Sequence, residues 1–501
     1  MCVTPVTLFA LLRRFDRVSG DRLTGLDDSF LHLERGGAHM HVAGTSIFEG
    51  PKPGYEEFRD HVASRLHLVP RFRQKLRFIP FGLARPVWED DPHLNLDYHV
   101  RQTALPPPGT EEQLRVLAAR IFSQALDRSK PLWELWLVDG LEGNRFAVVG
   151  KSHHCLVDGV SGVDINTVLF DTEREPAGTP APASEWLPRP EPSDAQVLAE
   201  AMLDRLTNPR ELAGGIAGLV RGPREIASRV RQGLAAVGEF AGSGLGAPSS
   251  PFNVEIGGHR RFAWVRGDLG QFKQIKDRLG GTVNDVVLAA VAGALGRYLR
   301  GRGHSTAGLT LRAMVPISVR TEDERGALGN RVSAMMAPLP VGLEDPVERL
   351  RTVTETMGDL KSSRQAVGAT LLTELTGFAP PTIVSQAARL QSRQRFFNLV
   401  VTNVPGPQFP LYVLGRELLA TFPMVPLAKN QAMCVGIMSY NGQINFGLIG
   451  DYDAIPDLDR LGADLEAAVS ELAAAADASP AAESPSARDG ARRLDGARAT
   501  S

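Results

Sequence analysis

The chain has 501 residues, of which 43% are hydrophobic and 22% are charged, a composition typical of globular proteins. Its length predicts two or three domains, each large enough to bury an apolar core. The 55 basic and 57 acidic residues leave a net charge of −2, which lacks the basic excess that nucleic-acid binding requires. The three cysteines are widely spaced and predict neither a disulfide framework nor a metal knuckle. These figures exclude a disordered chain and favour a cytoplasmic protein with no nucleic-acid partner.

Residues 1–20 match neither a secretory signal nor a membrane span. Their apolar run at 3–12 precedes Arg13 and Arg14, whereas a signal peptide carries its positive charges before the apolar run. No stretch of the sequence reaches the roughly 18 consecutive apolar residues that a transmembrane helix needs. We therefore expect an N-terminal extension at 1–20 and no membrane-spanning segment.

Residues 21–171 are predicted to form an N-terminal subdomain. Apolar runs at 135–138 and 146–149 are separated by the turn-forming pairs Asp139-Gly140 and Gly143-Asn144, which predicts two strands and a turn. Prolines and then glycines crowd residues 172–255, so this segment is expected to be a connector without its own core. Within it, residues 211–240 predict a basic amphipathic helix that packs on another domain or lies on a lipid surface.

Residues 256–476 are predicted to form a second, C-terminal subdomain. Apolar runs predict strands at 310–315, 397–401, 433–438 and 443–448, and helical spacing predicts helices at 284–299, 346–364 and 457–475. The run Asn-Val-Pro-Gly-Pro at 403–407 predicts a rigid turn after the strand at 397–401. Interleaved strands and helices indicate a mixed α/β class. Residues 477–501 are predicted to be a disordered tail.

The run Ser-His-His-Cys-Leu-Val-Asp-Gly at 152–159 is the strongest chemical signal in the sequence. Adjacent residues at a strand end point to opposite sides, so only one of His153 and His154 can face a cleft. Asp158 lies four residues beyond His154, and Gly159 permits a turn that places the carboxylate behind the imidazole or locks the loop. An imidazole held in this way is a candidate general base.

Four other interpretations of this stretch compete with a general base. Two histidines in a loop commonly make ordinary structural hydrogen bonds. A zinc site lacks a third ligand at metal spacing, and the run Gly-Val-Ser-Gly-Val at 159–163 lacks the second glycine of a nucleophile elbow. A phosphate loop at 150–152 lacks its first glycine, because position 145 is arginine. A base without a neighbouring nucleophile suggests that the substrate supplies one, as in direct acyl transfer to a bound hydroxyl.

The motif and several other runs of the sequence resemble a known family. The pattern His153-His154-x-x-x-Asp158-Gly159 is similar to the HHxxxDG motif of the CoA-dependent acyltransferase superfamily, which includes condensation domains of peptide synthetases. Further runs, in family order from about residue 21 to 470, resemble the bacterial wax ester synthase/diacylglycerol acyltransferase family. These runs are Leu-Asp-Asp-Ser-Phe-Leu-His-Leu-Glu at 26–34, Met-His-Val at 40–42, Pro-Leu-Trp at 131–133, Asn-Asp-Val-Val-Leu-Ala at 284–289, Val-Pro-Ile-Ser-Val-Arg at 315–320, Gly-Asn at 329–330 and Thr-Asn-Val-Pro-Gly-Pro at 402–407.

The resemblance implies two acyltransferase-like subdomains, each a mixed sheet flanked by helices, with an active-site tunnel where they meet. It also implies that acyl-CoA and a diacylglycerol or long-chain alcohol give triacylglycerol or wax ester and free CoA. His154 would then be the base, and Asp158 would order the loop through a salt bridge to an arginine. Acyl-CoA is a co-substrate, and no metal or redox cofactor is expected. An enzyme with such apolar substrates is expected at a membrane or lipid-droplet surface, peripherally bound.

Asn284 and Asp285 open the apolar run at 286–295. At a helix N-terminus this pair would support the acyl-transfer site or a phosphate-bearing ligand, or it would be a helix N-cap and its neighbour. The resemblance favours support of the site. The run Pro-Leu-Trp at 131–133 predicts a strand entry with a core tryptophan.

The sequence is compatible with three hypotheses of function. The Arg-, Ala- and Gly-rich composition is similar to that of high-GC actinobacterial members, which typically store triacylglycerol, and this favours diacylglycerol as the acceptor. The alternative function is a non-catalytic lipid-surface or carrier-protein-binding protein with the same fold. A third hypothesis replaces CoA with a carrier-protein thioester.

Overall fold

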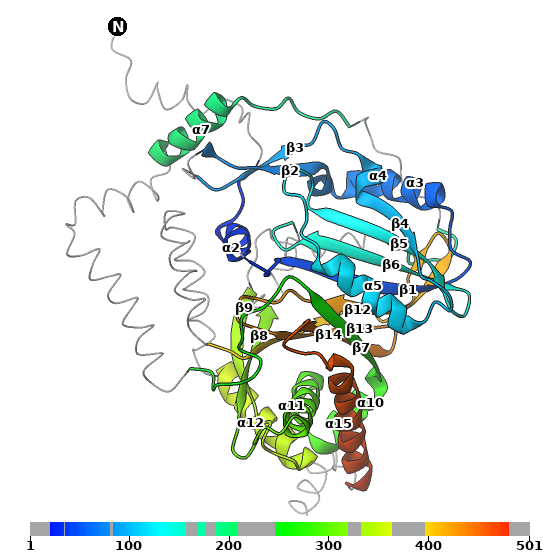
Figure 1. The fold of residues 1–501 in the computed structure, drawn as a ribbon, viewed down its shortest axis with the longest axis vertical. Helices are drawn as coiled ribbons and strands as arrows, with labels where there is room; N and C mark the ends of the chain where they lie inside the picture. The colour runs from blue at the N-terminus through cyan, green and yellow to red at the C-terminus, as the bar shows by residue number, and fades with distance from the viewer. Residues whose placement is uncertain are drawn as a thin grey trace, which may run out of the picture.

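The computed structural model describes residues 21–34, 36–80, 84–156, 169–176, 186–207, 246–318, 332–362 and 396–479. Four predictions therefore lie outside the described residues: the extension at 1–20, the loop that carries Asp158 and Gly159, the amphipathic helix at 211–240 and the tail beyond residue 479. The described part contains two six-stranded sheets, one above the other in Figure 1, with helices beside each. The mixed α/β class with two sheet-rich halves is confirmed.

The first sheet has the strand order β11 (Tyr412–Val413), β12 (Arg416–Met424), β1, β6, β5, β4. Among these described strands, β4 pairs with β5 in parallel, and the other neighbours pair antiparallel. The predicted strands at 135–138 and 146–149 are β5 and β6. The strands of the first sheet that come from the N-terminal half of the chain are β1 (His41–Glu49), β4 (Val100–Ala104), β5 (Trp133–Leu141) and β6 (Arg145–His153). Beside it lie a small two-stranded sheet and several helices: β2 (Gln74–Arg77), β3 (Val87–Asp90), α2 (Gly25–Leu33), α3 (Tyr55–Arg65), η1 (Leu66–Leu68), η2 (Pro70–Arg73), α4 (Leu96–His99), α5 (Glu111–Ser123) and α7 (Asp194–Thr207).

The second sheet has the strand order β7-β14-β13-β10-β8-β9, with β10 parallel to both of its neighbours. All four strands predicted in this half are present. Its elements are β7 (Arg260–Asp268), β8 (Leu311–Ser318), β9 (Val332–Leu339), β10 (Leu399–Pro405), β13 (Met433–Tyr440) and β14 (Gln443–Asp451), with helices α10 (Leu269–Leu279), α11 (Val283–Gly301), α12 (Pro346–Ser362) and α15 (Leu458–Ala478).

A hairpin from the C-terminal half of the chain completes the first sheet. β11 (Tyr412–Val413) and β12 (Arg416–Met424) follow β10 in the chain, yet β12 pairs with β1 and completes the first sheet. The ring of Phe422 on β12 stacks on Trp264 of β7, with centroids 4.5 Å apart. Gly447 on β14 is needed for this approach, because a Cβ there would lie 1.8 Å from the carbonyl oxygen of Pro423. A division of the chain into consecutive subdomains does not describe this shared sheet.

The helix α11 is the central helix of the second half. Its Thr282 N-cap and Asp285 form a capping box, an arrangement that satisfies two otherwise unpaired backbone N–H groups. Fourteen of its 19 residues are buried, and in Figure 1 it lies among α10, α12 and α15 below the second sheet. The prediction of helices at 284–299, 346–364 and 457–475 is confirmed over the described residues.

The turn predicted at 403–407 is wrong for its first three residues. β10 continues through Pro405, which pairs with Ser439 of the parallel strand β13. The pairing extends the strand because β13 itself runs to Tyr440 and supplies a partner for each residue from 400 to 405. Local turn propensity thus yields to sheet pairing at this position.

Within the described residues, each helix taken singly falls short of the length and apolarity that a membrane span requires. Only α10 and α11 taken together pass that test, and they meet at an angle of 97°.

Candidate active site

The two histidines of the motif lie where β6 ends. β6 continues through His153, because its last residues pair with β1 on one side and β5 on the other, as in His41 opposite His153 and Trp133 opposite Ser152. His154 is the first residue of the following turn, and its N–H donates to the carbonyl of Met40 at 2.8 Å. The side chain of His153 is fully buried, whereas His154 is partly exposed. The two adjacent histidines thus differ in burial, as neighbouring residues at a strand end do when they point to opposite sides.

His153 is held by a backbone turn and a carboxylate. The N–H of Cys155 donates to Nδ1 of His153 at 3.1 Å. Nε2 lies 3.7 Å from Oε2 of Glu34. The Cys155 thiol, 2.9 Å from Nδ1, is buried, and burial raises its pKa well above the ordinary value. His153 is thus fixed in orientation, and Cys155 is no thiolate nucleophile.

Glu34 joins the end of α2 to the end of β6. It accepts the N–H of Met40 at 3.1 Å and pairs with Arg128, whose Nε lies 3.2 Å from Oε2. Burial alone would raise the pKa of Glu34, but the hydrogen-bonding and charge contributions of His153 and Arg128 outweigh it and lower the pKa to about 2. Glu34 is therefore ionised at neutral pH and fixes the position of α2 relative to the histidine pair.

His154 lies against an aromatic ring. The imidazole stacks on Phe30 of α2, with centroids 4.0 Å apart and planes 20° apart. Burial lowers the pKa of His154 to about 4, so the ring is neutral at pH 7 and able to accept a proton. Its Nδ1 is buried and makes no hydrogen bond to the described residues. A neutral, partly exposed imidazole is the state that a general base requires.

A second layer of polar groups lies on the first sheet near the pair. His41, opposite His153 in the register, is buried, and its Nε2 lies 2.6 Å from the carbonyl oxygen of Phe122. Lys151 has no exposed side-chain surface and lies 3.2 Å from Glu134, with further donation to the carbonyls of Ile121 and Gln124. Lys151 and Glu134 thus form a buried ion pair in the same sheet as the histidines.

Asp158 and Gly159 lie outside the described residues, so their roles stay predictions. Asn284 and Asp285 are the second and third residues of α11, and the N-cap is Thr282. The N-cap interpretation of this pair is therefore wrong, because the hydroxyl of Thr282 takes that position. Asp285 accepts from Thr282, and Oδ1 of Asn284 lies 3.5 Å from the amide of Asn403 on β10. The hydrogen bonds of both residues thus lie within the second half and do not reach the histidine pair.

Trp133 confirms the prediction for the run at 131–133. It begins β5, is 1% exposed, and donates its indole N–H to the carbonyl of Phe72 at 2.8 Å. Among the described residues, no group of three or more His, Cys, Asp and Glu side chains has a geometry able to hold a metal ion.

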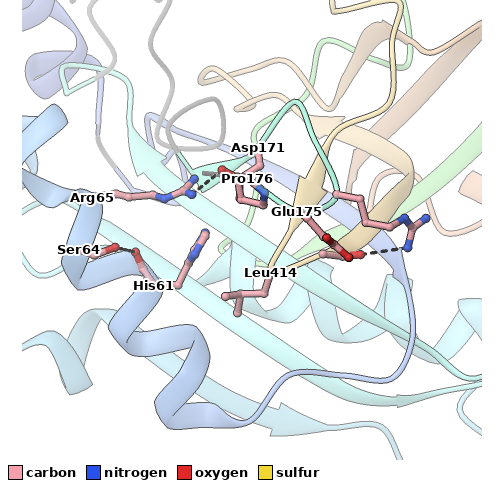
Figure 2. A pocket seen from close by; sticks show the side chains of 9 residues that line it. His61, Ser64, Arg65, Asp171, Glu175, Pro176 and Leu414 are labelled. Carbon is pink, nitrogen blue, oxygen red and sulfur yellow. Dashed lines mark hydrogen bonds and ion pairs between the residues drawn. The ribbon is translucent and has the colours of Figure 1, made fainter. Parts of the chain in front are cut away.

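A cavity of about 490 Å³ lies at the opposite end of the first sheet (Figure 2). Among its lining residues, Arg65 of α3 pairs with Asp171 at 2.5 Å. Leu414, in the turn between β11 and β12, also lines it. The lining residue Arg174 pairs with Glu49, the last residue of β1, whereas the histidine pair lies at its first residue. Nine residues of strand span roughly 26 Å. This cavity is therefore separate from the candidate active site.

Two solved structures of acyl-transfer proteins have a fold similar to that of this chain. The first condensation domain of the calcium-dependent antibiotic synthetase has a similar fold, with a TM-score of 0.54 at 16% identity, covering 93% of this chain and 98% of that one. The wax ester synthase/diacylglycerol acyltransferase of Marinobacter aquaeolei superposes with a TM-score of 0.64 at 28% identity, covering 91% of this chain and all of that one.

The sequence comparisons identify the family. The profile of the wax ester synthase/diacylglycerol acyltransferase catalytic domain matches residues 23–287, and that of the WS/DGAT C-terminal domain matches residues 328–473. The Mycobacterium tuberculosis protein named probable diacylglycerol O-acyltransferase tgs1 is 33% identical over 462 residues, which cover 91% of this chain and 96% of that protein. The one named tgs2 is 34% identical over 455 residues, covering 89% and 97%. The chain belongs to the wax ester synthase/diacylglycerol acyltransferase family.

The sequence interpretation missed three residues that shape the site. Phe30 and Glu34 stand in the run at 26–34 that carried part of the resemblance, but neither was assigned a role. Arg128 gave no signal in the sequence, since it follows α5 in a connecting segment. Helical spacing would have placed Phe30 and Glu34 four residues apart on one side of a helix that ends beside them, but spacing alone does not reveal which partner that side meets.

Proposed function

We propose that the protein transfers the acyl group of an acyl-CoA to the free hydroxyl of a diacylglycerol, which gives triacylglycerol and CoA. Long-chain alcohols are proposed as second acceptors, giving wax esters. Family membership and the names of the mycobacterial relatives support the reaction class and this acceptor. The observation that carries the proposal is the neutral, partly exposed imidazole of His154 on the ring of Phe30. A site of this kind offers an acceptor hydroxyl a proton acceptor in apolar surroundings.

The proposed chemistry needs one base and no metal. Neutral His154 accepts the proton of the acceptor hydroxyl as its oxygen attacks the thioester carbon. A tetrahedral oxyanion forms, the carbon–sulfur bond breaks, and the departing CoA thiolate takes the proton from the imidazolium. The ester and free CoA leave, and His154 is neutral again. Because the thioester is already activated, the protein mainly positions the two substrates and stabilises the oxyanion.

The other site residues have supporting roles in this proposal. His153, held by Cys155 and Glu34, fixes the end of β6 and thereby the backbone that carries His154. Asp158 and Gly159 order the loop that follows. Asn284 and Asp285 set the first turn of α11 and support the acyl-transfer site from the second half. The substrates are proposed to meet in a tunnel between the two halves.

The proposed location is the cytoplasmic face of a membrane or the surface of a lipid droplet, with peripheral attachment. Diacylglycerol and triacylglycerol partition out of water, so the enzyme must meet them at an interface. The segment 211–240, with Arg221, Arg224, Arg229 and Arg231, is the proposed contact. Each arginine near an anionic surface contributes on the order of 1 kcal/mol, and salt weakens the attraction.

An assay of the purified protein with palmitoyl-CoA tests the function. Thiol release is followed with diacylglycerol, with hexadecanol and without acceptor. We expect release with either acceptor, faster with diacylglycerol, and little release without one. Turnover with hexadecanol alone would replace the proposal with wax ester synthesis. Stoichiometric binding of acyl-CoA without any turnover would favour a non-catalytic lipid-surface protein.

A further inference from the structure

A second cavity, of about 390 Å³, is lined mainly by residues of α11, α12 and α15, the helices that lie below the second sheet in Figure 1. It is remote from the histidine pair, which belongs to the first sheet. Apart from Gly293, every residue that lines it carries an ionisable side chain: Arg297, Arg300, Glu344, Arg349, Arg460, Asp464 and Glu471. Such a wall is unusual, because most small-molecule cavities are lined mainly by apolar side chains.

Arg349 on α12 forms the buried part of this wall. Its side chain is 2% exposed. Nε donates to the carbonyl of Ala289 at 3.0 Å, and Nη1 donates to the carbonyls of Leu343 and Glu344 at 3.0 and 3.1 Å. Nη2 makes no hydrogen bond to the described residues, and its ion-pair contact, with Glu471, is at 4.0 Å. One side of the guanidinium is thus anchored to backbone, and the other side lacks a close acceptor.

The backbone of α11 is adapted to this guanidinium. A Cβ at Gly293 would lie 2.7 Å from Cζ of Arg349. Glycine inside a helix is less favourable than alanine by about 1 kcal/mol. Glycine at position 293 thus lets the guanidinium of Arg349 lie directly against the backbone of α11.

The cavity has an excess of positive charge. Four guanidinium groups face three carboxyl groups. Arg297 pairs with Glu471, and Nε of Arg300 lies 3.7 Å from Glu344. Arg460, which is exposed, donates only to the carbonyl of Gly301 at 3.4 Å and has no carboxylate within ion-pair distance in the described part of the chain. Burial lowers the pKa of Arg349 to about 10, so it remains charged at neutral pH. An anion bound in the cavity would offset this excess of positive charge.

We propose that this cavity binds a phosphate group. Arg300 and Arg460 would contact its oxygens, and the buried Nη2 of Arg349, which lacks a close acceptor, would donate to it. Guanidinium groups suit phosphate because their fixed N–H pairs match two oxygens at once. The group is either inorganic phosphate or the exposed phosphate of a lipid such as phosphatidic acid, and the experiment separates these sources.

Calorimetric titration of the full-length protein with inorganic phosphate, at constant ionic strength in chloride, tests the proposal. We expect saturable binding of one phosphate per chain. Arg349→Gln and Arg460→Gln should each weaken it about ten- to hundredfold, the usual effect of losing a charge-assisted hydrogen bond. Arg351→Gln is the matched control, because Arg351 is exposed on the same helix and does not line the cavity. If Arg349→Gln fails to fold, Arg460→Gln decides alone.

Flotation with phosphatidylcholine vesicles, with and without phosphatidic acid, distinguishes the two sources. Binding to the phosphatidic acid vesicles that inorganic phosphate displaces and Arg460→Gln abolishes would identify a lipid phosphate. Saturable phosphate binding with no Arg460-dependent flotation would identify free phosphate. Equal titration heats for the wild type and Arg460→Gln, or no saturable heat for the wild type together with Arg460-independent flotation, would overturn the site and show a self-contained ion-pair network.

Discussion

The ring of Phe30 lies nearly parallel to the imidazole of His154, with centroids 4.0 Å apart. The contact joins α2, near the start of the described chain, to the turn after β6. It covers one face of the proposed base with apolar surface, and burial is the largest cause of the lowered pKa of His154. Phe30 is therefore expected to set the pH range in which His154 can accept a proton.

Replacing Phe30 by alanine should move the pH dependence of catalysis. In the wild type the pKa of His154 is about 4, so the base stays neutral down to mildly acidic pH. Opening one face to water should raise the pKa toward its ordinary value of about 6.5, and the acidic limb of kcat/KM should shift to higher pH. The measurement is a pH–rate profile with Phe30→Tyr as the control that retains the stack. Superimposable acidic limbs for all three proteins would rule out this role.

The two histidines should differ in what their loss removes. His154→Ala should lower kcat by about 10²–10⁴, the usual effect of losing a general base, with little change in the melting temperature. His153→Ala should reduce activity less through chemistry and lower the melting temperature, because His153 is buried and held by Cys155 and Glu34. Steady-state kinetics and thermal unfolding of both variants check this. A folded His154→Ala protein with wild-type turnover would remove His154 from the mechanism.

Glu34→Gln should change the acid stability of the protein. The pKa of Glu34 is about 2 in the folded protein and about 4.3 in an unfolded chain. A lowered carboxyl pKa contributes stability that is present above the unfolded value and is lost as pH falls from about 4.3 to 2. The variant should be less stable than the wild type at pH 7, by on the order of 1 kcal/mol after solvent screening.

That difference should shrink as pH approaches 2. Denaturant unfolding of both proteins between pH 7 and 2.5 measures it, and Glu112→Gln, at an exposed position on α5, is the control. A stability difference that does not depend on pH would mean that the charge of Glu34 is not what anchors α2.

Asp158→Asn tests the expected ordering role of the motif carboxylate. The substitution keeps size and removes the charge that would pair with an arginine. If Asp158 orders the loop, the melting temperature and the activity should fall together. Lost activity at an unchanged melting temperature would instead indicate that the carboxylate takes part directly in the reaction.

Local pattern predicted much of this fold and fell short where distant segments meet. The apolar helix α11 and the strands β13 and β14 were predictable because each carries its own periodicity. The place of β12 in the first sheet was not, since alternation within a strand does not specify which sheet it joins. The same limit applies to the site. The spacing of His154 and Asp158 could be read directly, whereas the contacts of Phe30 and Glu34 depend on where α2 packs.

The hairpin of β11 and β12 also determines when the first sheet can be completed. β12 lies between β11 and β1 in that sheet, but it is separated from β6 by most of the second half of the chain. At about 5–20 residues per second, β12 is synthesised tens of seconds after β6. Until then, β1 has an unpaired edge, which is a site for wrong pairing and aggregation. The nascent N-terminal half therefore exposes this edge of β1 until β12 leaves the ribosome.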